Sequence, residues 1–413
     1  MAGLCFQSML AGCLLIVAAA GAEIRLHTPL QSDHKAFAAF MREHGRAYSK
    51  GTAEYDHRLA LFSLRLNKAA QQNARPDRLW TAGVGPLADY SKDELQQLRG
   101  WFGSASSTRG HGGQMQRTGM FLAQTGSRES AAKKALPEEF LNWTKLSSLS
   151  ATLDQGQCGS CWALAAATIL DAHAEIHKSA QRSFSVQELV SCVPNPRNCG
   201  GSGGCQGATV ELALNYALNA HMQTDDQYPY LGGDGICVKD SSAAVAMQVS
   251  SNHVQEDITQ VGAHEAGMLS SGMHGWERLP ENKAEPMLRA LYERGPVGVS
   301  VAADGWQMYS DGIFDACDKD AVIDHAVTLI GYGKDPSLNN QKFWLIQNSW
   351  GNSWGENGRI RLLREDDDEA HCGTDRQPEA GSGCDGGPAA VKVCGMCGVL
   401  YDTTVPHFGA KLE

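Results

Sequence analysis

The segment 155-QGQCGSCWA-163 places two cysteines, Cys158 and Cys161, on either side of a Gly-Ser pair. Residues 161–176, CWALAAATILDAHAEI, are apolar or small on nearly every face for about three turns, which predicts a helix that begins at Cys161 and is buried inside a domain. The start of a helix lowers the pKa of a cysteine thiol, because the helix dipole and the free N–H groups favour the thiolate. This C-x-x-C has three interpretations: a redox pair, two metal ligands, or a bridged cysteine beside a nucleophile.

The N-terminus favours an exported protein. Residues 9–20 form an apolar run that ends in the small residues Ala20, Gly21 and Ala22, which predicts a signal peptide over residues 1–22. A membrane anchor is the alternative, but the run is shorter than the roughly 20 residues that a span needs. Cysteines of exported proteins usually form disulfides. The chain has thirteen cysteines, and the two in this segment, Cys5 and Cys13, leave an odd number, so one thiol is unpaired or bridges to another molecule.

Composition and charge exclude some partners. The chain has 413 residues, of which 42% are hydrophobic and 20% charged, so a sizeable core is expected. Its formal net charge is −11 and it has no basic run, which argues against nucleic acid as a partner. No segment after the N-terminal run is apolar enough to predict a membrane span.

The chain divides at a stretch of small and polar residues. Before it, residues 37–73 follow a helical pattern, with Tyr55, Leu59, Phe62 and Leu66 on one face. Residues 104–119, SASSTRGHGGQMQRTG, cannot bury a core and predict an exposed linker that is open to proteolysis. After the buried helix, β-branched and aromatic runs predict an antiparallel sheet or barrel, at residues 295–303, 325–333, 342–351 and 358–363. The fold class is therefore α+β.

Two short motifs offer partners for the thiol of Cys161. His325 opens a predicted strand in 324-DHAV-327, and Asn348 follows another in 348-NSWG-351. A histidine can form a thiolate–imidazolium pair with a cysteine, and an amide oxygen can hold the imidazole in the required tautomer. Gln155 could donate its side-chain N–H to an oxyanion hole that the backbone N–H of Cys161 completes.

Taken together, these motifs resemble the papain family, in particular its cathepsin L-like cysteine proteases. The resemblance covers roughly residues 136–406 and includes LPEEFLNW (136–143), ELVSC (188–192), YPY (228–230) and GYG (331–333) in the family's order. Upstream, Glu54, Arg58, Phe62 and Asn73 have the spacing of the family's inhibitory propeptide helix, and GVGPLADYS (83–91) resembles its second propeptide motif. The resemblance implies a zymogen with a propeptide over residues 23–130, cut within the linker at 104–130, and a peptidase domain over residues 131–413.

The resemblance also implies how the cysteines pair. Three bridges are expected, Cys158–Cys205, Cys192–Cys237 and Cys317–Cys397, which leave Cys161 as the free nucleophile. Four cysteines exceed the family's pattern and are expected to form two further bridges in one of three pairings: Cys199, Cys372, Cys384 and Cys394. The alternative for these four is a zinc knuckle with His371. We expect neither a metal nor another cofactor.

By the same resemblance, Asp402 lies at the base of the S2 pocket. A carboxylate there could pair with an arginine at P2, so we expect P2 Arg to be accepted beside Leu or Phe. The walls of this pocket are expected from Val210, Ile323 and Ala326. Ala208 should narrow the entrance on the non-primed side, and Trp350 should shield the bond between His325 and Asn348.

The function expected from these features is a cysteine endopeptidase with two lobes, one helical and one barrel-like, and the active site between them. An exopeptidase would need an insertion that blocks one end of the cleft, for which residues 241–275 are a candidate, and a non-enzymatic binding protein would be expected to lack Cys161 or His325. The expected partners are protein or peptide substrates and the chain's own propeptide, and the expected form is a monomer. The secretory pathway would deliver it to a lysosome or vacuole, or outside the cell.

Overall fold

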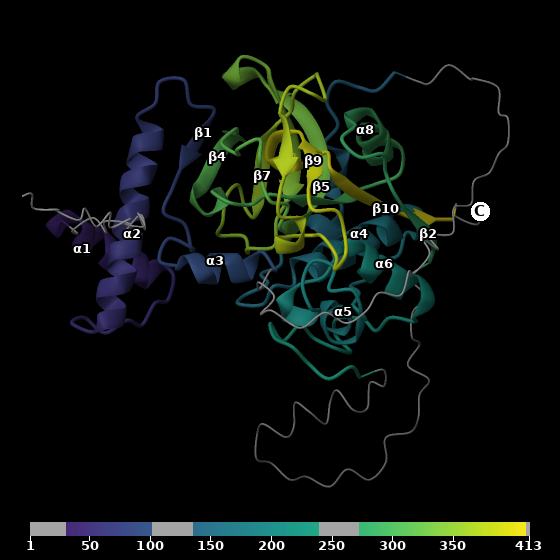
Figure 1. Ribbon diagram of the computed structural model, residues 1–413, viewed down its shortest axis with the longest axis horizontal. Helices are drawn as coiled ribbons and strands as arrows, with labels where there is room; N and C mark the ends of the chain where they lie inside the picture. The colour runs from purple at the N-terminus through teal and green to yellow at the C-terminus, as the bar shows by residue number, and fades with distance from the viewer. Residues whose placement is uncertain (1–29, 101–134, 239–271, 410–413) are drawn as a thin grey trace, which may run out of the picture.

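The computed structural model describes residues 30–100, 135–238 and 272–409 (Figure 1). The predicted signal peptide, the activation linker at 104–130 and most of the segment 241–275 lie outside these residues. Within them, no helix has both the length and the apolar character needed to cross a membrane. The polypeptide forms a helical N-terminal segment, a helical lobe and a sheet lobe.

The N-terminal segment, residues 30–100, has its own small core. Its elements are α1 (Gln31–Glu43), α2 (Ala53–Asn73), β1 (Trp80–Ala82) and α3 (Lys92–Leu98). The predicted helical run from residue 37 to 73 is thus divided in two, and the break includes Gly45, whose φ of +63° ends the first helix. Phe37, Tyr55 and Phe62 pack in one cluster between α1 and α2. Figure 1 shows these two helices standing apart from the lobes, whereas α3 points toward them.

The helical lobe is built around one enclosed helix. Its elements are η1 (Asn142–Lys145), η2 (Ser147–Leu149), α4 (Cys161–Lys178), α5 (Val186–Cys192), η3 (Gly204–Gln206) and α6 (Val210–Asn219). As the sequence predicts, α4 begins at Cys161 and is buried on nearly all sides over its first turns. It contacts α5 and α6 on one side and strands β3, β5 and β10 of the sheet lobe on the other.

The sheet lobe contains one open sheet. Its elements are β2 (Met273–Arg278), α8 (Ala284–Glu293), β3 (Val297–Val301), η4 (Trp306–Met308), β4 (Tyr309–Phe314), β5 (His325–Asp335), η5 (Pro336–Leu338), β6 (Gln341–Gln347), β7 (Arg359–Leu363) and β10 (Asp402–Phe408). The strand order is β1-β4-β7-β6-β5-β3-β10-β2. The α+β class and two-lobe architecture are confirmed, but the strands of the described residues do not close into a barrel. One pair, β4 and β7, is parallel.

The N-terminal segment contributes the edge strand of this sheet. Strand β1 pairs antiparallel with β4, and Trp80 lies opposite Gly312. A Cβ atom at residue 312 would lie 2.4 Å from the carbonyl oxygen of Leu79, so the close pairing requires glycine there. The segment therefore attaches to the edge of the sheet through the backbone of β1.

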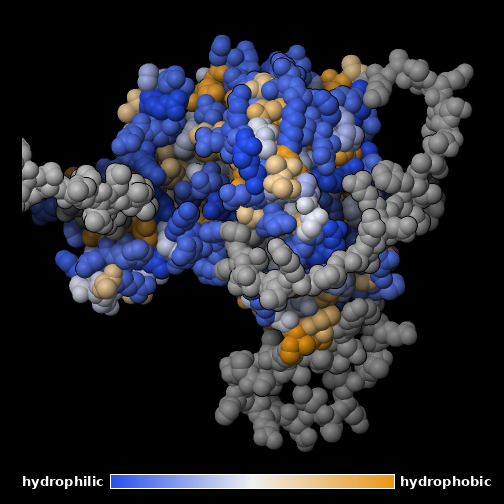
Figure 2. Space-filling model, viewed as in Figure 1, coloured by the Kyte–Doolittle hydropathy of each residue, from blue (hydrophilic) through white to orange (hydrophobic). Residues whose placement is uncertain are grey.

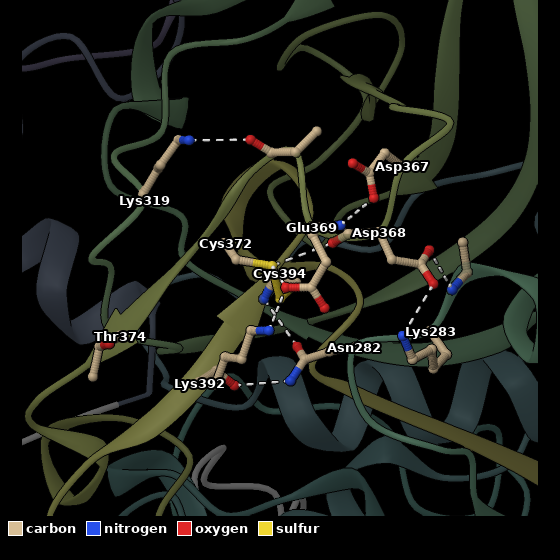
Figure 3. The surroundings of a disulfide bond; sticks show 12 residues. Asn282, Lys283, Lys319, Asp367, Asp368, Glu369, Cys372, Thr374, Lys392 and Cys394 are labelled. Carbon is tan, nitrogen blue, oxygen red and sulfur yellow. Dashed lines mark hydrogen bonds and ion pairs between the residues drawn. A yellow bond between two sulfur atoms is a disulfide. The ribbon is translucent and has the colours of Figure 1, made fainter.

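Five disulfides join the described cysteines. Cys158–Cys205, Cys192–Cys237 and Cys317–Cys397 are present, as the resemblance implied, together with Cys199–Cys384 and Cys372–Cys394. The last of these links facing residues of a small hairpin, β8 (Cys372–Asp375) and β9 (Val391–Cys394) (Figure 3). Between and after these strands lie η6 (Pro378–Ala380) and η7 (Met396–Gly398). With the sulfurs of Cys372 and Cys394 joined to each other, the zinc alternative loses two of its ligands.

Candidate active site

Cys161 lies at the first residue of α4, where the helical lobe meets the sheet lobe. It is the only unpaired cysteine among the described residues, and 4% of its surface is exposed. The preceding turn is fixed by the Cys158–Cys205 disulfide and by the backbone N–H of Gly159, which donates to the Cys205 carbonyl at 3.0 Å. Because Cys158 is bridged elsewhere, the redox interpretation of the C-x-x-C is not realised.

His325 and Asn348 are brought together by neighbouring strands. His325 is the first residue of β5, Asn348 directly follows β6, and the two strands pair antiparallel. Nε2 of His325 lies 2.8 Å from Oδ1 of Asn348, while Nδ1 has no hydrogen-bond partner. His325 and Cys161 line the same pocket, which holds about 340 Å³ of empty space. The ring is thus fixed at one nitrogen and keeps the other available.

Aromatic rings cover the His325–Asn348 pair. The ring centroid of Trp350 lies 5.1 Å from that of His325, and Trp306 lies edge-on to His325 at 6.1 Å. Both tryptophans are almost completely buried. The sequence indicated Trp350 for this position, whereas Trp306 comes from a separate segment with no recognisable motif.

Gln155 is held by an interaction that the sequence analysis missed. Its Oε1 accepts a hydrogen bond from the hydroxyl of Ser349 at 2.6 Å, which turns Nε2 toward the cleft. Nε2 donates to the carbonyl oxygens of Cys158 at 2.8 Å and Leu98 at 2.7 Å. The side-chain N–H of Gln155, which the sequence predicted would bind the oxyanion of a substrate, is therefore bound to the carbonyl oxygen of Leu98 in the N-terminal segment.

The N-terminal segment crosses the cleft directly beside Cys161. The carbonyl oxygen of Arg99 lies 3.9 Å from Sγ of Cys161. Gly100 fits between Gly159 and Gly207, where a Cβ on Gly207 would lie 1.7 Å from the Gly100 oxygen. Such a close approach of two backbones is possible only between glycines, and it excludes any other chain from this part of the cleft.

Arg99 adds ion pairs to this contact. Its guanidinium lies 3.2 Å from Asp304 and 3.3 Å from Asp324, the residue before His325. Neither Arg99 nor Asp304 lies in a recognisable sequence motif, so this contact could not be predicted from the sequence. Asp324 was visible in 324-DHAV-327, but only its neighbour was given a role.

Burial beneath the N-terminal segment favours the neutral forms of Cys161 and His325. Burial raises the pKa of the Cys161 thiol to about 11 and lowers the pKa of His325 to about 4. The expectation of a lowered cysteine pKa at the helix start therefore does not hold in this covered state, because loss of hydration outweighs the helix dipole. Neutral thiol and imidazole are unreactive.

Exposing the cleft to water changes the protonation of Asp324 and His325 in opposite directions. Burial raises the pKa of Asp324 to about 6, so between about pH 6 and pH 4 the covered state holds a protonated Asp324 and a neutral His325. When uncovered, both return toward their ordinary pKa values, so Asp324 loses a proton and His325 gains one. Acid favours opening through His325 and closure through Asp324. The two effects oppose each other, so the titration of Asp324 and His325 gives no clear preference for the open state in acid.

The residues expected around the S2 pocket divide into two groups. Ala208 and Ala326 line the pocket beside Cys161, together with Ser300. Val210 and Ile323 are buried in the cores of the two lobes and are not among its lining residues. That pocket is bounded in part by Arg99 and Gly100 of the N-terminal segment, so the role of Val210 and Ile323 in the S2 pocket stays a prediction.

Asp402 has a partner within the chain. Its Oδ1 lies 2.7 Å from Nε of Arg278, and its Oδ2 accepts from the hydroxyl of Ser300 at 2.7 Å. Only 5% of its surface is exposed. Glu211 lies near the same guanidinium, and burial, followed by the Asp402 charge, raises the pKa of Glu211. The free carboxylate on which the expectation of P2 Arg depended is therefore already neutralised.

The comparisons with known proteins identify the family. Residues 136–382, more than half of the chain, match the family model described as papain family cysteine protease, and residues 37–95 match that of the cathepsin propeptide inhibitor domain. A senescence-specific cysteine protease of Arabidopsis thaliana is 28% identical over 85% of this chain and 91% of its own length. Fruit bromelain of Ananas comosus is 26% identical over 80% of each chain.

Solved structures share the fold. A recombinant stem bromelain precursor aligns with a TM-score of 0.64 at 23% identity, over 92% of this chain and all of its own. A digestive procathepsin L of Tenebrio molitor larval midgut aligns with a TM-score of 0.63 at 22% identity, over 91% of this chain and 99% of its own.

The Arg58–Glu94 ion pair should set the acid response of the N-terminal segment. A hydrogen bond from Arg58, 2.5 Å long, is the main cause that lowers the pKa of Glu94 to about 2. A lowered pKa adds stability above the ordinary value near 4.5, which is lost as the pH falls toward 2. We expect Glu94→Gln to activate at a higher pH and over a broader range than wild type, measured as self-processing against pH. The exposed neighbour Asp93→Asn is the matched control, and identical profiles for all three proteins would contradict the prediction.

Freeing Asp402 should change selectivity at P2. In Arg278→Gln the carboxylate loses its guanidinium and can accept one from a substrate. We expect the ratio of kcat/KM for P2 Arg over P2 Leu to rise about tenfold or more, since a hydrogen bond to a charged group contributes about 1.5–3 kcal/mol. Fluorogenic peptides that differ only at P2 measure it, with Arg289→Gln on α8 as the control. An unchanged ratio would show that Arg278 does not govern this pocket.

Proposed function

Because the chain belongs to the papain family of cysteine proteases and carries a cathepsin propeptide inhibitor domain, we propose that Cys161, His325 and Asn348 are its catalytic residues. The protein is then a zymogen that hydrolyses peptide bonds through an acyl-enzyme, and Gln155 supplies the oxyanion hole. Its substrates are proteins or peptides.

One observation carries the proposal. His325 is bonded at Nε2 to Asn348, its Nδ1 has no partner, and it shares a pocket with an unpaired cysteine at a helix start. A histidine fixed only for packing would need no such free nitrogen beside a thiol. These contacts support the assignment of Cys161 as the nucleophile, His325 as the base and Asn348 as the group that orients the base.

The covered cleft also supports the role of Gln155. The Leu98 carbonyl accepts from its Nε2 at 2.7 Å, as the oxyanion of a substrate would. The carbonyl oxygen of Arg99 lies 3.9 Å from the thiol, and burial raises the pKa of Cys161 and lowers that of His325, which opposes attack on the segment. The N-terminal segment thus inhibits by occupying the donor and by removing water.

The reaction follows once the segment has left. Water returns to the cleft, the pKa of Cys161 falls, that of His325 rises, and the proton passes from the thiol to the imidazole. The thiolate attacks the scissile carbonyl, and Gln155 together with the backbone N–H of Cys161 stabilises the oxyanion. His325 then protonates the leaving amine, and a water molecule that His325 deprotonates releases the acyl group.

The processing and destination belong to the same proposal. We place the signal peptide at residues 1–22, the propeptide at 23–130 with its cut in 104–130, and the peptidase domain at 131–413. The secretory pathway, ending in a lysosome or vacuole or outside the cell, fits the five disulfides, which form in oxidising compartments. The expected form is a monomer.

Alkylation near pH 5 tests the nucleophile, because ordinary thiols react slowly there. We expect iodoacetamide to label Cys161 after acid processing and not before, as read by peptide mapping of unreduced protein. Cys161→Ala should abolish hydrolysis, and Asn348→Ala should lower kcat by about 10² because the imidazole loses its orientation. The exposed Asn215→Ala on α6 is the control. Equal labelling before and after processing, or full activity of Cys161→Ala, would refute the proposal.

A further inference from the structure

The four cysteines beyond the family's usual pattern are all used by one structural feature. Residues 376–390, here called the strap, connect β8 to β9. The Cys372–Cys394 disulfide closes the base of this hairpin, and the strand pairs run from Cys372 opposite Cys394 to Asp375 opposite Val391 (Figure 3). The second additional disulfide, Cys199–Cys384, holds the tip of the strap.

The tip of the strap is fastened to the helical lobe. Cys199 lies in the loop between α5 and η3, so its bridge to Cys384 joins segments 185 residues apart in sequence. Backbone contacts flank the bridge on both sides: Gly200 N–H donates to the Gly383 carbonyl at 2.9 Å, and Asp385 N–H donates to the Arg197 carbonyl at 2.8 Å. The tip therefore has one position relative to this loop.

The middle of the strap is fastened to the sheet lobe. Ser382 N–H donates to the carbonyl of Ile323 at 2.7 Å, and Ile323 N–H donates to the carboxylate of Asp375 at 3.2 Å. A Cβ on Gly381 would lie 2.1 Å from the same Ile323 oxygen. Ile323 is two residues before His325, so the strap rests on the chain that leads into the catalytic histidine.

The strap thus passes from one lobe to the other beside the reactive residues. Gly381 and Ser382 of the strap, and Gly200 of the loop it binds, line the same pocket as Cys161 and His325. The remaining lining residues are Arg99 and Gly100 of the N-terminal segment, together with Ala208, Thr209, Ser300, Asp324 and Ala326. Ser300 is hydrogen-bonded to Asp402, the residue that the family resemblance places at the base of the S2 pocket. From this position we infer that the strap lies on the non-primed side.

The strap and Cys161 border one pocket. It holds about 340 Å³ of empty space, and in the covered state Arg99 and Gly100 of the N-terminal segment also border it. An extended peptide advances about 3.3 Å per residue, so a chain that continued past P2 would have to pass through a segment fixed by a disulfide and by backbone hydrogen bonds. The primed side has no strap among the described residues.

We infer that the strap closes the non-primed end of the cleft, so that this peptidase releases short peptides, mainly dipeptides, from the free N-terminus of its substrates. The inference rests on the proposed function and narrows its substrate to chain ends. Of the two modes of cleavage weighed from the sequence, it favours the exopeptidase. The blocking element is the strap; the segment 241–275, in which the sequence placed it, lies almost entirely outside the described residues.

Matched substrates test the inference on the acid-processed enzyme. One fluorogenic substrate has two residues and a free amino terminus, and its partner carries the same two residues extended by three more. We expect wild type to favour the shorter substrate about tenfold or more in kcat/KM. Digestion of an unlabelled peptide, followed by mass spectrometry over time, should show successive loss of dipeptides from its N-terminus.

Removal of the strap should reverse this preference. In the test variant an Asn-Gly turn replaces residues 376–390, which joins β8 to β9 as a tight hairpin, and Cys199→Ser removes the thiol left behind. We expect kcat/KM for the extended substrate to rise about tenfold or more, with little change for the dipeptide. The control, Cys372→Ser with Cys394→Ser, lacks one disulfide but keeps the tip fastened, and should retain the wild-type ratio.

The outcomes separate this inference from the proposed function. Equal use of both substrates by wild type, or internal cuts as the first products, would overturn the role of the strap while leaving the peptidase intact. Failure to hydrolyse any peptide, with Cys161 unlabelled by iodoacetamide, would overturn the proposed function. If the strapless variant does not fold, the substrate ratio and product series of wild type decide the question.

Discussion

The enclosure of α4 is the constraint on which the rest of the structure depends. A helix that is apolar or small on nearly every face must be covered on every side, and here the two lobes share that task, with α5 and α6 on one side and β3, β5 and β10 on the other. The N-terminal end of such a helix has to emerge where its two covers meet. Cys161 therefore lies at the boundary between the lobes, within reach of the first residue of β5. The cleft and the position of the thiol have the same cause.

The N-terminal segment binds at that boundary mainly through its backbone. It adds β1 to the free edge of the sheet and inserts Leu98, Arg99 and Gly100 between the lobes. Inhibition then requires no special inhibitory side chain at the thiol. Burial raises the pKa of Cys161 and lowers that of His325, and a carbonyl of the segment occupies Gln155. The contact between the segment and the cleft excludes water. The same loss of water disfavours the thiolate–imidazolium pair of Cys161 and His325.

The site residues that could be predicted from the sequence are those that stand in short motifs. Cys161, His325 and Asn348 could be identified because each stands in a local pattern at the end of a recognisable element. The pairing of Asp402 with Arg278 could not, since it joins residues 124 positions apart and depends on the register of β10 with β2. The open sheet and the inward direction of Ile323 likewise follow from packing. The four additional cysteines allowed three pairings, and only the fold selects between them.

Composition explains why the strap uses both of the additional disulfides. Residues 376–390, RQPEAGSGCDGGPAA, contain no apolar side chain larger than proline, so the strap can bury little hydrophobic surface. Ordering a backbone opposes folding by about 1–2 kcal/mol for each residue, and a strap with little apolar surface gains little from hydrophobic burial to offset this cost. A bridge at the base and another at the tip restrict the unfolded chain instead. The two disulfides therefore act together with the backbone hydrogen bonds of Ser382, Gly383 and Asp385 to hold the strap in one position.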